Sequence, residues 1–232
     1  MRSAVKTPVF LVLSVFSIIA TACSQGNPEI RSSSWQVYRD QQADGSFVER
    51  LSLFIFFEDS DGEADFSSLT LFHDETGLQW TVPAQEAQAR LRGKDRWVGS
   101  NRLLGPGGLS FPTGRYTLSL TDLAGNESLS NFDLAPPDFP ERAPMSFRIE
   151  GDKWIMEKNP DSLLFSRFYL FLYDSDDVLL YSWRIPDTAA KTTVEGRVAS
   201  LKSLSSKAET VRCYVENSGS TAGVLLTPLK IR

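Results

Sequence analysis

Runs of alternating apolar and polar residues, closed by short turns rich in Asp and Gly, recur along most of the chain. In the clearest run, Phe47–Glu58, four large apolar side chains share one face: Leu51, Leu53, Ile55 and Phe57. A period of two residues is typical of a β-strand with one face in a core. Phe54 and Phe56 lie on the opposite face, which indicates that this strand is covered on both sides near its end. We therefore expect an all-β fold with Phe47–Glu58 at the centre of its first core.

Further strands are expected wherever the same pattern returns. They fall at residues 35–38, 67–73, 78–82, 111–122, 129–134, 145–150, 153–156, 165–173, 178–185, 210–216 and 224–231, whereas 192–204 is ambiguous. Pro83–Arg92 is rich in Ala, Gln and Glu and is followed by Gly93, so we expect a loop with a short helix there. The next segment, Gly93–Gly99, is predicted to be a loop.

Ala135–Pro144 is the clearest boundary in the chain. It contains four prolines in ten residues, and proline lacks an amide hydrogen and favours extended backbone. A semi-rigid linker over 135–144 therefore separates two units, 35–134 and 145–232. Each is close to the size of a β-sandwich domain.

One motif carries a resemblance to a known kind of domain. The run Pro112–Asn126, P-x-G-x-Y-x-L-x-L-x-D-x-A-G-N, resembles the final hairpin of bacterial immunoglobulin-like and fibronectin-like domains. The earlier stretch Asp59–Leu71 resembles the middle of such domains. The resemblance implies two tandem immunoglobulin-like β-sandwich domains, and it brings no family-wide catalytic residue.

The N-terminal segment indicates export. Arg2 and Lys6 precede an apolar run, Pro8–Ala20, that is too short for an ordinary transmembrane helix and is typical of a signal peptide. The sequence Ala20-Thr-Ala-Cys23 resembles the lipobox of bacterial lipoproteins, which implies a signal peptide over 1–22, palmitate and other acyl chains on Cys23, and a flexible tether over 23–34. The alternative is cleavage after A-x-A, with Cys23 a free thiol, or a retained N-terminal anchor.

Charge and cysteine content exclude several function classes. Removal of residues 1–22 leaves 22 Lys and Arg against 29 Asp and Glu, a net charge of −7. Such a chain repels nucleic acid, and we expect no nucleic-acid partner. With Cys23 lipidated, Cys213 has no disulfide partner, and its alternation with Val211 and Val215 predicts a buried thiol.

Two clusters of polar residues are candidates for chemistry. His73 precedes Asp74 and Glu75, which could orient it as a base in a hydrolase, but no nucleophile or hydrolase motif accompanies it, and we expect a surface histidine at a strand end. Acidic residues alternate at positions 59, 61, 63 and 65 around Gly62. Asp59, Asp61 and Asp65 are candidate calcium ligands, although the EF-hand spacing fails and solvated turn residues are the favoured interpretation.

Aromatic residues suggest a binding role. The chain has five tryptophans, most of which we expect in cores, and Trp97 is the expected exception because it lies in a predicted loop beside three cations, Lys94, Arg96 and Arg102. These four residues are the candidate contact for a partner or ligand.

We expect a non-enzymatic lipoprotein of the cell envelope, directed to the outer membrane by Ser24 after the lipidated cysteine, that needs no cofactor and binds a protein partner or supports an assembly. The alternatives are a carbohydrate- or peptidoglycan-binding module and, less favoured, a hydrolase that uses His73.

Overall fold

Strands make up nearly all of the secondary structure in the computed structural model, which describes residues 26–60, 62–159, 165–185 and 192–231. The strands of the first half are β1 (Glu29–Gln41), β2 (Phe47–Glu58), β3 (Phe66–His73), β4 (Gln79–Pro83), β5 (Gln88–Arg92), β6 (Asp95–Leu104), β7 (Gly114–Asp122) and β8 (Glu127–Leu134). Those of the second half are β9 (Met145–Glu150), β10 (Lys153–Lys158), β11 (Phe165–Tyr173), β12 (Leu179–Ile185), β13 (Thr193–Arg197), β14 (Thr210–Asn217), β15 (Ala222–Leu225) and β16 (Leu229–Lys230), with one helix, α1 (Val198–Leu204). The predicted all-β sandwich architecture is confirmed.

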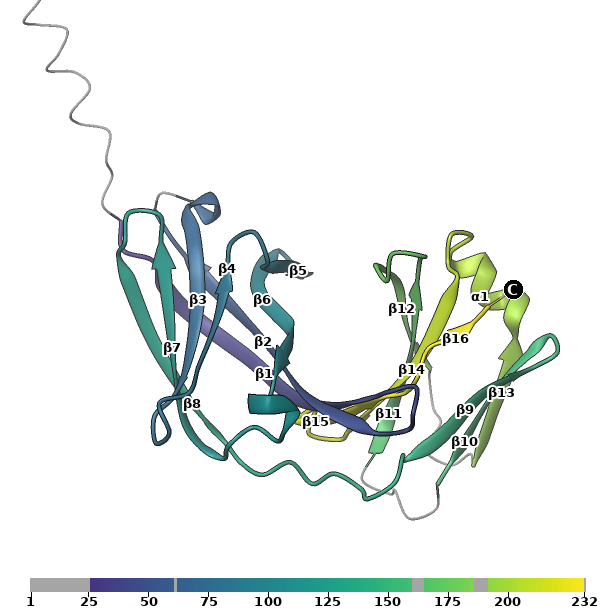
Figure 1. Cartoon of the computed structure of the whole chain (residues 1–232). Helices are drawn as coiled ribbons and strands as arrows, with labels where there is room; N and C mark the ends of the chain where they lie inside the picture. The colour runs from purple at the N-terminus through teal and green to yellow at the C-terminus, as the bar shows by residue number, and fades with distance from the viewer. Residues whose placement is uncertain (1–25, 61, 160–164, 186–191, 232) are drawn as a thin grey trace, which may run out of the picture.

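A single nine-stranded sheet runs through both halves of the molecule. Its strand order is β12-β11-β14-β15-β1-β2-β6-β5, and β16 pairs with β14 outside this path. A four-stranded sheet, β4-β3-β7-β8, covers it in the first half, and a three-stranded sheet, β13-β10-β9, covers it in the second. Figure 1 shows the long sheet as a curved strip with β1 and β15 at the bend and the two smaller sheets on its convex side.

Two separate hydrophobic cores fill the spaces between these sheets. In the first half, Leu51, Leu53, Ile55 and Phe57 of β2 are buried against β3 and β7, as the alternation predicts. In the second half, alternate residues of β11 and β14 meet β10 and α1. Burial of each large apolar side chain contributes about 1.5–3 kcal/mol, so packing alone can hold each sandwich.

The two sandwiches meet where β1 pairs with β15 in parallel. Val37 lies opposite Ala222, and Asp40 lies opposite Leu225. The strands are 180 residues apart in sequence, and this pairing makes the two predicted units share one sheet. In this register Val37 and Val224 point to the convex side, into the first and second core respectively, while Tyr38 and Leu225 point to the concave side.

The proline-rich segment 135–144 contacts both halves along the convex side. Phe139 packs against both cores, and the Arg39 guanidinium lies 4.5 Å from the centre of its ring. Arg39 also donates a hydrogen bond to the Pro140 carbonyl at 3.0 Å. The linker is therefore held against β1 and not suspended between the two sandwiches.

The buried tyrosine of β7 gives a physical basis for the resemblance to immunoglobulin-like domains. Tyr116 is fully buried, and its hydroxyl donates to the Pro112 carbonyl at 2.7 Å. A buried tyrosine that binds the backbone a few residues upstream is the tyrosine corner of immunoglobulin-like sandwiches.

Two segments differ from the sequence-based expectation. Glu29–Ser34, predicted to be part of a flexible tether, belongs to β1, because it pairs with β2 as far as Glu58. Its polar side chains hide this pairing from the sequence pattern, although Arg31 binds Glu58 at 2.8 Å and anchors it. The prediction of a flexible tether is therefore wrong from Glu29 onward. Cys23 and the predicted signal peptide lie outside the described residues.

The region after β4 is also different. Gln88–Arg92, expected to contain a short helix, is the edge strand β5, and the predicted loop Gly93–Gly99 lies mostly in β6. A tight turn at Gly93, where φ is +65°, joins the two strands, and pairing of β5 with β6 overrides the helical preference of Gln88, Ala89 and Leu91. The segment Val224–Ile231, expected to be one strand, is divided between β15 and β16.

None of the helices in the described parts of the chain is long and apolar enough to cross a lipid bilayer.

Candidate functional site

Two adjoining cavities open on the concave face of the long sheet, at the seam between the sandwiches. They share four lining residues: Tyr38, Asn101, Tyr173 and Leu225. The larger, about 300 Å³, is completed by charged residues: Asp40, Arg50, Arg102, Asp177 and Arg212. The smaller, about 130 Å³, is completed by Gln36, Ser52, Arg90, Phe171 and Tyr214. We call these two cavities together the seam cleft, since residues of both halves are needed to form it.

Aromatic rings form the floor of the seam cleft. Tyr214 stacks on Phe171 with ring centroids 5.4 Å apart, and Tyr38 meets Tyr214 edge-on at 6.3 Å. Tyr169 lies 6.1 Å from Phe171 on the same face of β11. The rings come together because residues 169, 171 and 173 point to the concave side, opposite the buried Phe168, Leu170 and Leu172.

A glycine on the neighbouring strand allows Tyr214 to lie flat on the sheet. A Cβ atom at Gly223 would stand 2.1 Å from the Tyr214 hydroxyl oxygen and 2.5 Å from Cζ of its ring. Any side chain at this position would therefore displace the ring from its stacking position on Phe171.

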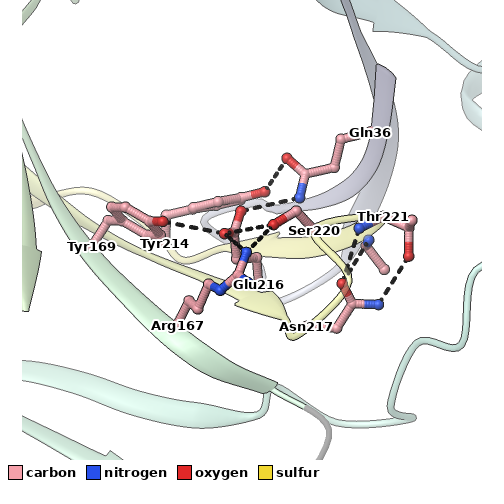
Figure 2. A network of polar contacts seen from close by, with 9 residues as sticks. Gln36, Arg167, Tyr169, Tyr214, Glu216, Asn217, Ser220 and Thr221 are labelled. Atoms are coloured by element: carbon pink, nitrogen blue, oxygen red, sulfur yellow. Dashed lines mark hydrogen bonds and ion pairs between the residues drawn. The ribbon is translucent and has the colours of Figure 1, made fainter. Parts of the chain in front are cut away.

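A buried carboxylate fixes one flank of this aromatic floor, as Figure 2 shows. Glu216 accepts hydrogen bonds from Gln36 at 3.2 Å, from the Tyr169 hydroxyl at 3.2 Å and from Ser220 at 3.0 Å, and it pairs with Arg167 at 3.4 Å. The Tyr214 hydroxyl in turn donates to Gln36 at 2.6 Å. These contacts join β1, β11 and β14, so the network holds the rings in place and leaves Glu216 fully engaged.

Arginine dominates the charge of the seam cleft. Its lining residues include four arginines and two aspartates, in a chain whose formal net charge is −5. Asp40 binds Arg50 at 2.8 Å and also accepts a hydrogen bond from Arg212, so one carboxylate serves two guanidinium groups. Arg90 lies 3.8 Å from the centre of the Phe54 ring, and burial lowers the pKa of its guanidinium, helped by Arg92. The seam cleft is therefore a positive site on a negative protein.

Neutral hydrogen-bonding groups complete the seam cleft. Burial raises the pKa of Tyr38 and of Tyr173 to about 12, so both phenols keep their protons at neutral pH. The Tyr38 hydroxyl donates to the Asn101 carbonyl at 2.6 Å. The side-chain oxygen of Asn101 is fully buried in the wall of the cleft and has no hydrogen-bond partner in the described part of the protein, so it is an unsatisfied acceptor that a ligand cannot reach.

Of the residues predicted to contact a partner, only Arg102 lines the seam cleft. Trp97 is only 8% exposed, because it lies in β6 with the Arg92 guanidinium 4.5 Å above its ring, so the exposed loop predicted for it is wrong. Lys94 lies exposed at the β5–β6 turn. Arg96 points to the opposite side of β6 and lines a separate cavity of about 400 Å³ among small alanine side chains. The four residues therefore do not form one surface.

His73 is buried in the first sandwich and does not lie on the surface as predicted. It is 1% exposed, its Nδ1 is 2.7 Å from the Thr76 hydroxyl, and its Nε2 is 3.0 Å from the Thr113 carbonyl. A carbonyl only accepts, so Nε2 carries the proton and Nδ1 accepts from Thr76. Both ring nitrogens are used to close the β3–β4 turn against β7.

Two of the three predicted calcium ligands, Asp59 and Asp65, lie close together, and Asp122 from the end of β7 joins them. Oxygens of Asp59, Asp65 and Asp122 lie within 4.8 Å of one another, whereas Asp61 lies outside the described residues. Asp122 accepts hydrogen bonds from the backbone and side-chain nitrogens of Asn126, at 2.7 and 2.8 Å. Burial acts to raise the pKa of Asp122, but these hydrogen bonds outweigh it and lower the pKa. The sequence missed Asp122 because it is distant along the chain.

The other sulfur and indole groups serve packing. Cys213 is fully buried, with its sulfur 3.2 Å from the Met145 sulfur, and burial raises the pKa of the thiol far above its ordinary value. This agrees with the predicted buried thiol. The remaining tryptophans also pack as predicted: Trp35 on Phe132, Trp80 on Phe111, and Trp154 on Trp183.

No protein-family model matches the sequence, and no curated protein matches it. Several solved structures align with the chain, each with a TM-score below 0.5. The 47-kilodalton lipoprotein Tp47 of Treponema pallidum aligns with a TM-score of 0.39 and 11% identity, over 87% of this chain and 50% of its own. Murine CEACAM1b aligns with a TM-score of 0.26 and 11% identity, over 86% and 99% respectively. Alpha-2-macroglobulin from Escherichia coli aligns with a TM-score of 0.27 and 12% identity, over 90% and 64%. The chain thus spans half the length of Tp47.

Proposed function

We propose that the protein is a non-enzymatic binding module of the bacterial cell envelope, held to the outer membrane by a lipid on Cys23. The observation that supports binding is the seam cleft, an open site with an aromatic floor and an excess of arginine at the junction of two sandwiches. Ligand sites favour such junctions because residues of two units converge there.

The structure of His73 favours binding over hydrolysis. A histidine that acts as a general base must present one ring nitrogen to the substrate. Both nitrogens of His73 instead hold the β3–β4 turn, and the side chain is buried beside Tyr116 at a ring distance of 4.8 Å. We assign His73 to stability of the first sandwich.

Membrane attachment rests on the lipobox-like sequence that ends at Cys23. Strand β1 begins at Glu29, so the five residues 24–28 separate it from Cys23. At about 3.5 Å per residue these span less than about 20 Å, which holds the first sandwich close to the bilayer. Several acyl chains on one cysteine make attachment effectively permanent.

Replacement of the proposed lipid anchor tests this placement. We expect Cys23→Ala to move the protein from the membrane to the soluble fraction and to remove the mass of the acyl chains, measured by fractionation and intact-protein mass spectrometry. The matched control is Cys213→Ala, which removes the buried cysteine and should leave both readouts unchanged. A Cys23→Ala product that stays membrane-bound with an unchanged mass would refute the anchor.

A protein partner in the envelope remains part of this proposal. Crosslinking in native membranes followed by mass spectrometry should recover one recurrent neighbour, with crosslinks that Cys23→Ala removes. The aromatic floor and the arginines favour a second candidate, carbohydrate binding, at the seam cleft and not at Trp97.

A further inference from the structure

We propose that the seam cleft binds an anionic saccharide, with a sugar ring against the aromatic floor and its carboxylate or sulfate group paired with arginine. This inference rests on the proposed binding function and adds the chemical class of the ligand. Four features of the site support this proposal. They are an excess of positive charge, exposed ring surfaces, hydroxyl groups at the cavity wall, and strands whose backbone is already paired on both sides.

The positive charge calls for an anion. Within the described residues, neither Arg90 nor Arg102 has an acidic partner for its guanidinium, and Asp40 is shared between Arg50 and Arg212. Arg90 is partly buried among Tyr38, Tyr173 and Tyr214, where a charge without a counter-ion is costly. A bound carboxylate or sulfate would supply that counter-ion, and guanidinium groups bind such planar or multidentate anions well.

The ring surfaces and hydrogen-bonding groups suit a sugar. A pyranose presents an apolar face of C–H groups and a rim of hydroxyls that both donate and accept. Phe171 and Tyr173 are partly exposed at the cavity wall and offer apolar ring surface. Ser52 and Tyr173 line the smaller cavity and bring hydroxyl groups to its wall. The larger cavity, about 300 Å³, reaches the lower end of the range of about 300–1,000 Å³ for small-molecule sites.

The strands under the cleft have no free edge, which disfavours binding of a peptide as an added strand. Strands β1, β14 and β15 under the cleft are paired on both sides, so no free edge can add a strand. Recognition must therefore come from side chains. The acidic character of the whole chain disfavours nucleic acid, which presents a long row of negative charges to the entire surface.

The test is a binding titration with the full lipidated protein in detergent, by calorimetry. The probes are oligogalacturonate for the carboxylate, a sulfated dextran oligomer for the sulfate, and maltohexaose as the neutral saccharide. A poly-glutamate peptide and a deoxythymidine oligonucleotide test the two other classes of polyanion. We expect at least one acidic saccharide to bind, with affinity that falls as salt rises, and maltohexaose to bind at least tenfold more weakly.

Two variants locate the binding. Arg90→Gln removes the charge and keeps much of the shape of the side chain. We expect this variant to bind the acidic saccharide about tenfold or more weakly, which is the usual effect of losing one charge-assisted hydrogen bond. Arg142→Gln, on the exposed linker, is the matched control and should bind like the wild type. Phe171→Leu should weaken binding of the saccharide and leave the weak binding of inorganic sulfate unchanged. Circular dichroism checks that each variant is folded.

Several results would overturn the inference. No binding of either acidic saccharide would do so, as would equal binding by Arg90→Gln and the wild type. Equal affinity for poly-glutamate or the oligonucleotide would mean that the site attracts any polyanion. In each case a recurrent crosslinked protein neighbour that depends on Cys23 would leave the proposed envelope function standing.

Discussion

At the scale of single residues, buried polar side chains show how much of the fold depends on a few hydrogen bonds. Tyr116, His73 and Glu216 are each buried, and each has its polar atoms engaged with backbone or side-chain partners. A buried polar group is tolerated only when it is hydrogen-bonded. These three residues therefore stabilise the fold, although the sequence offered His73 as a candidate base.

Loss of the tyrosine corner should lower stability without changing the fold. In Tyr116→Phe the ring still fills the core, but the Pro112 carbonyl loses its donor. We expect the free energy of unfolding to fall by about 1–3 kcal/mol, measured by denaturant titration. Tyr181→Phe, at an exposed tyrosine of β12, is the control and should change stability by less than about 0.5 kcal/mol. Equal stability of the two variants would contradict this role of Tyr116.

At the scale of secondary-structure elements, β14 and β15 depend on a close approach of ring and backbone. Gly223→Ala places a methyl group against the Tyr214 ring, whereas Gly219→Ala meets nothing closer than 3.7 Å. We expect Gly223→Ala to cost about 1–3 kcal/mol of unfolding free energy and to change the near-ultraviolet circular dichroism of the stacked rings. Gly219→Ala is the matched control. If both variants leave the aromatic spectrum unchanged, the packing of Tyr214 is not as described.

Strand prediction succeeded where one face is strictly apolar and failed elsewhere. The bounds of β2 and β11 match the predicted runs because Leu51–Phe57 and Phe168–Leu172 are long apolar runs in which every second residue is buried. The start of β1 was missed because its side chains are polar, and β5 because its residues favour helix. Both segments are strands only because a neighbouring strand pairs with them. The local sequence pattern does not indicate this pairing.

The seam cleft could be predicted only in part. Arg102 was singled out for its charge, but the aromatic residues at 169, 171 and 173 of β11 were not recognised as part of a site. Their meeting with Tyr38 and Arg90 depends on the parallel pairing of β1 with β15, across 180 residues of chain. The alternation of residues within β1 or β15 does not reveal which strand each of them pairs with.

At the scale of the whole molecule, the shared sheet predicts that both sandwiches unfold together. The Arg212–Asp40 ion pair crosses from β14 to β1 and is largely buried. Arg212→Met removes one of two partners of Asp40, and we expect a loss of about 2–3 kcal/mol, somewhat less than for a buried charge that loses its only partner. In calorimetry the single transition of the wild type should broaden or divide in two.

The matched control for this prediction is Arg148→Met, which breaks exposed ion pairs with Glu150 and Glu157 on β9 and β10. Exposed pairs contribute less than about 1 kcal/mol, so its transition should stay single and near the wild-type temperature. Two transitions in the wild type, or identical scans for the two variants, would show that the seam does not couple the halves.

The course of β1 through both sandwiches has a mechanical consequence. Separated from Cys23 by five residues, this strand is hydrogen-bonded to β2 along its whole length and to β15 near its end. A pull from the lipid would be transmitted lengthwise along β1, so the bonds to β2 would bear load together and not open one at a time from an end. With Cys23 lipidated as proposed, tension at the bilayer would then reach the proposed ligand site directly, because Tyr38 and Asp40 belong to β1.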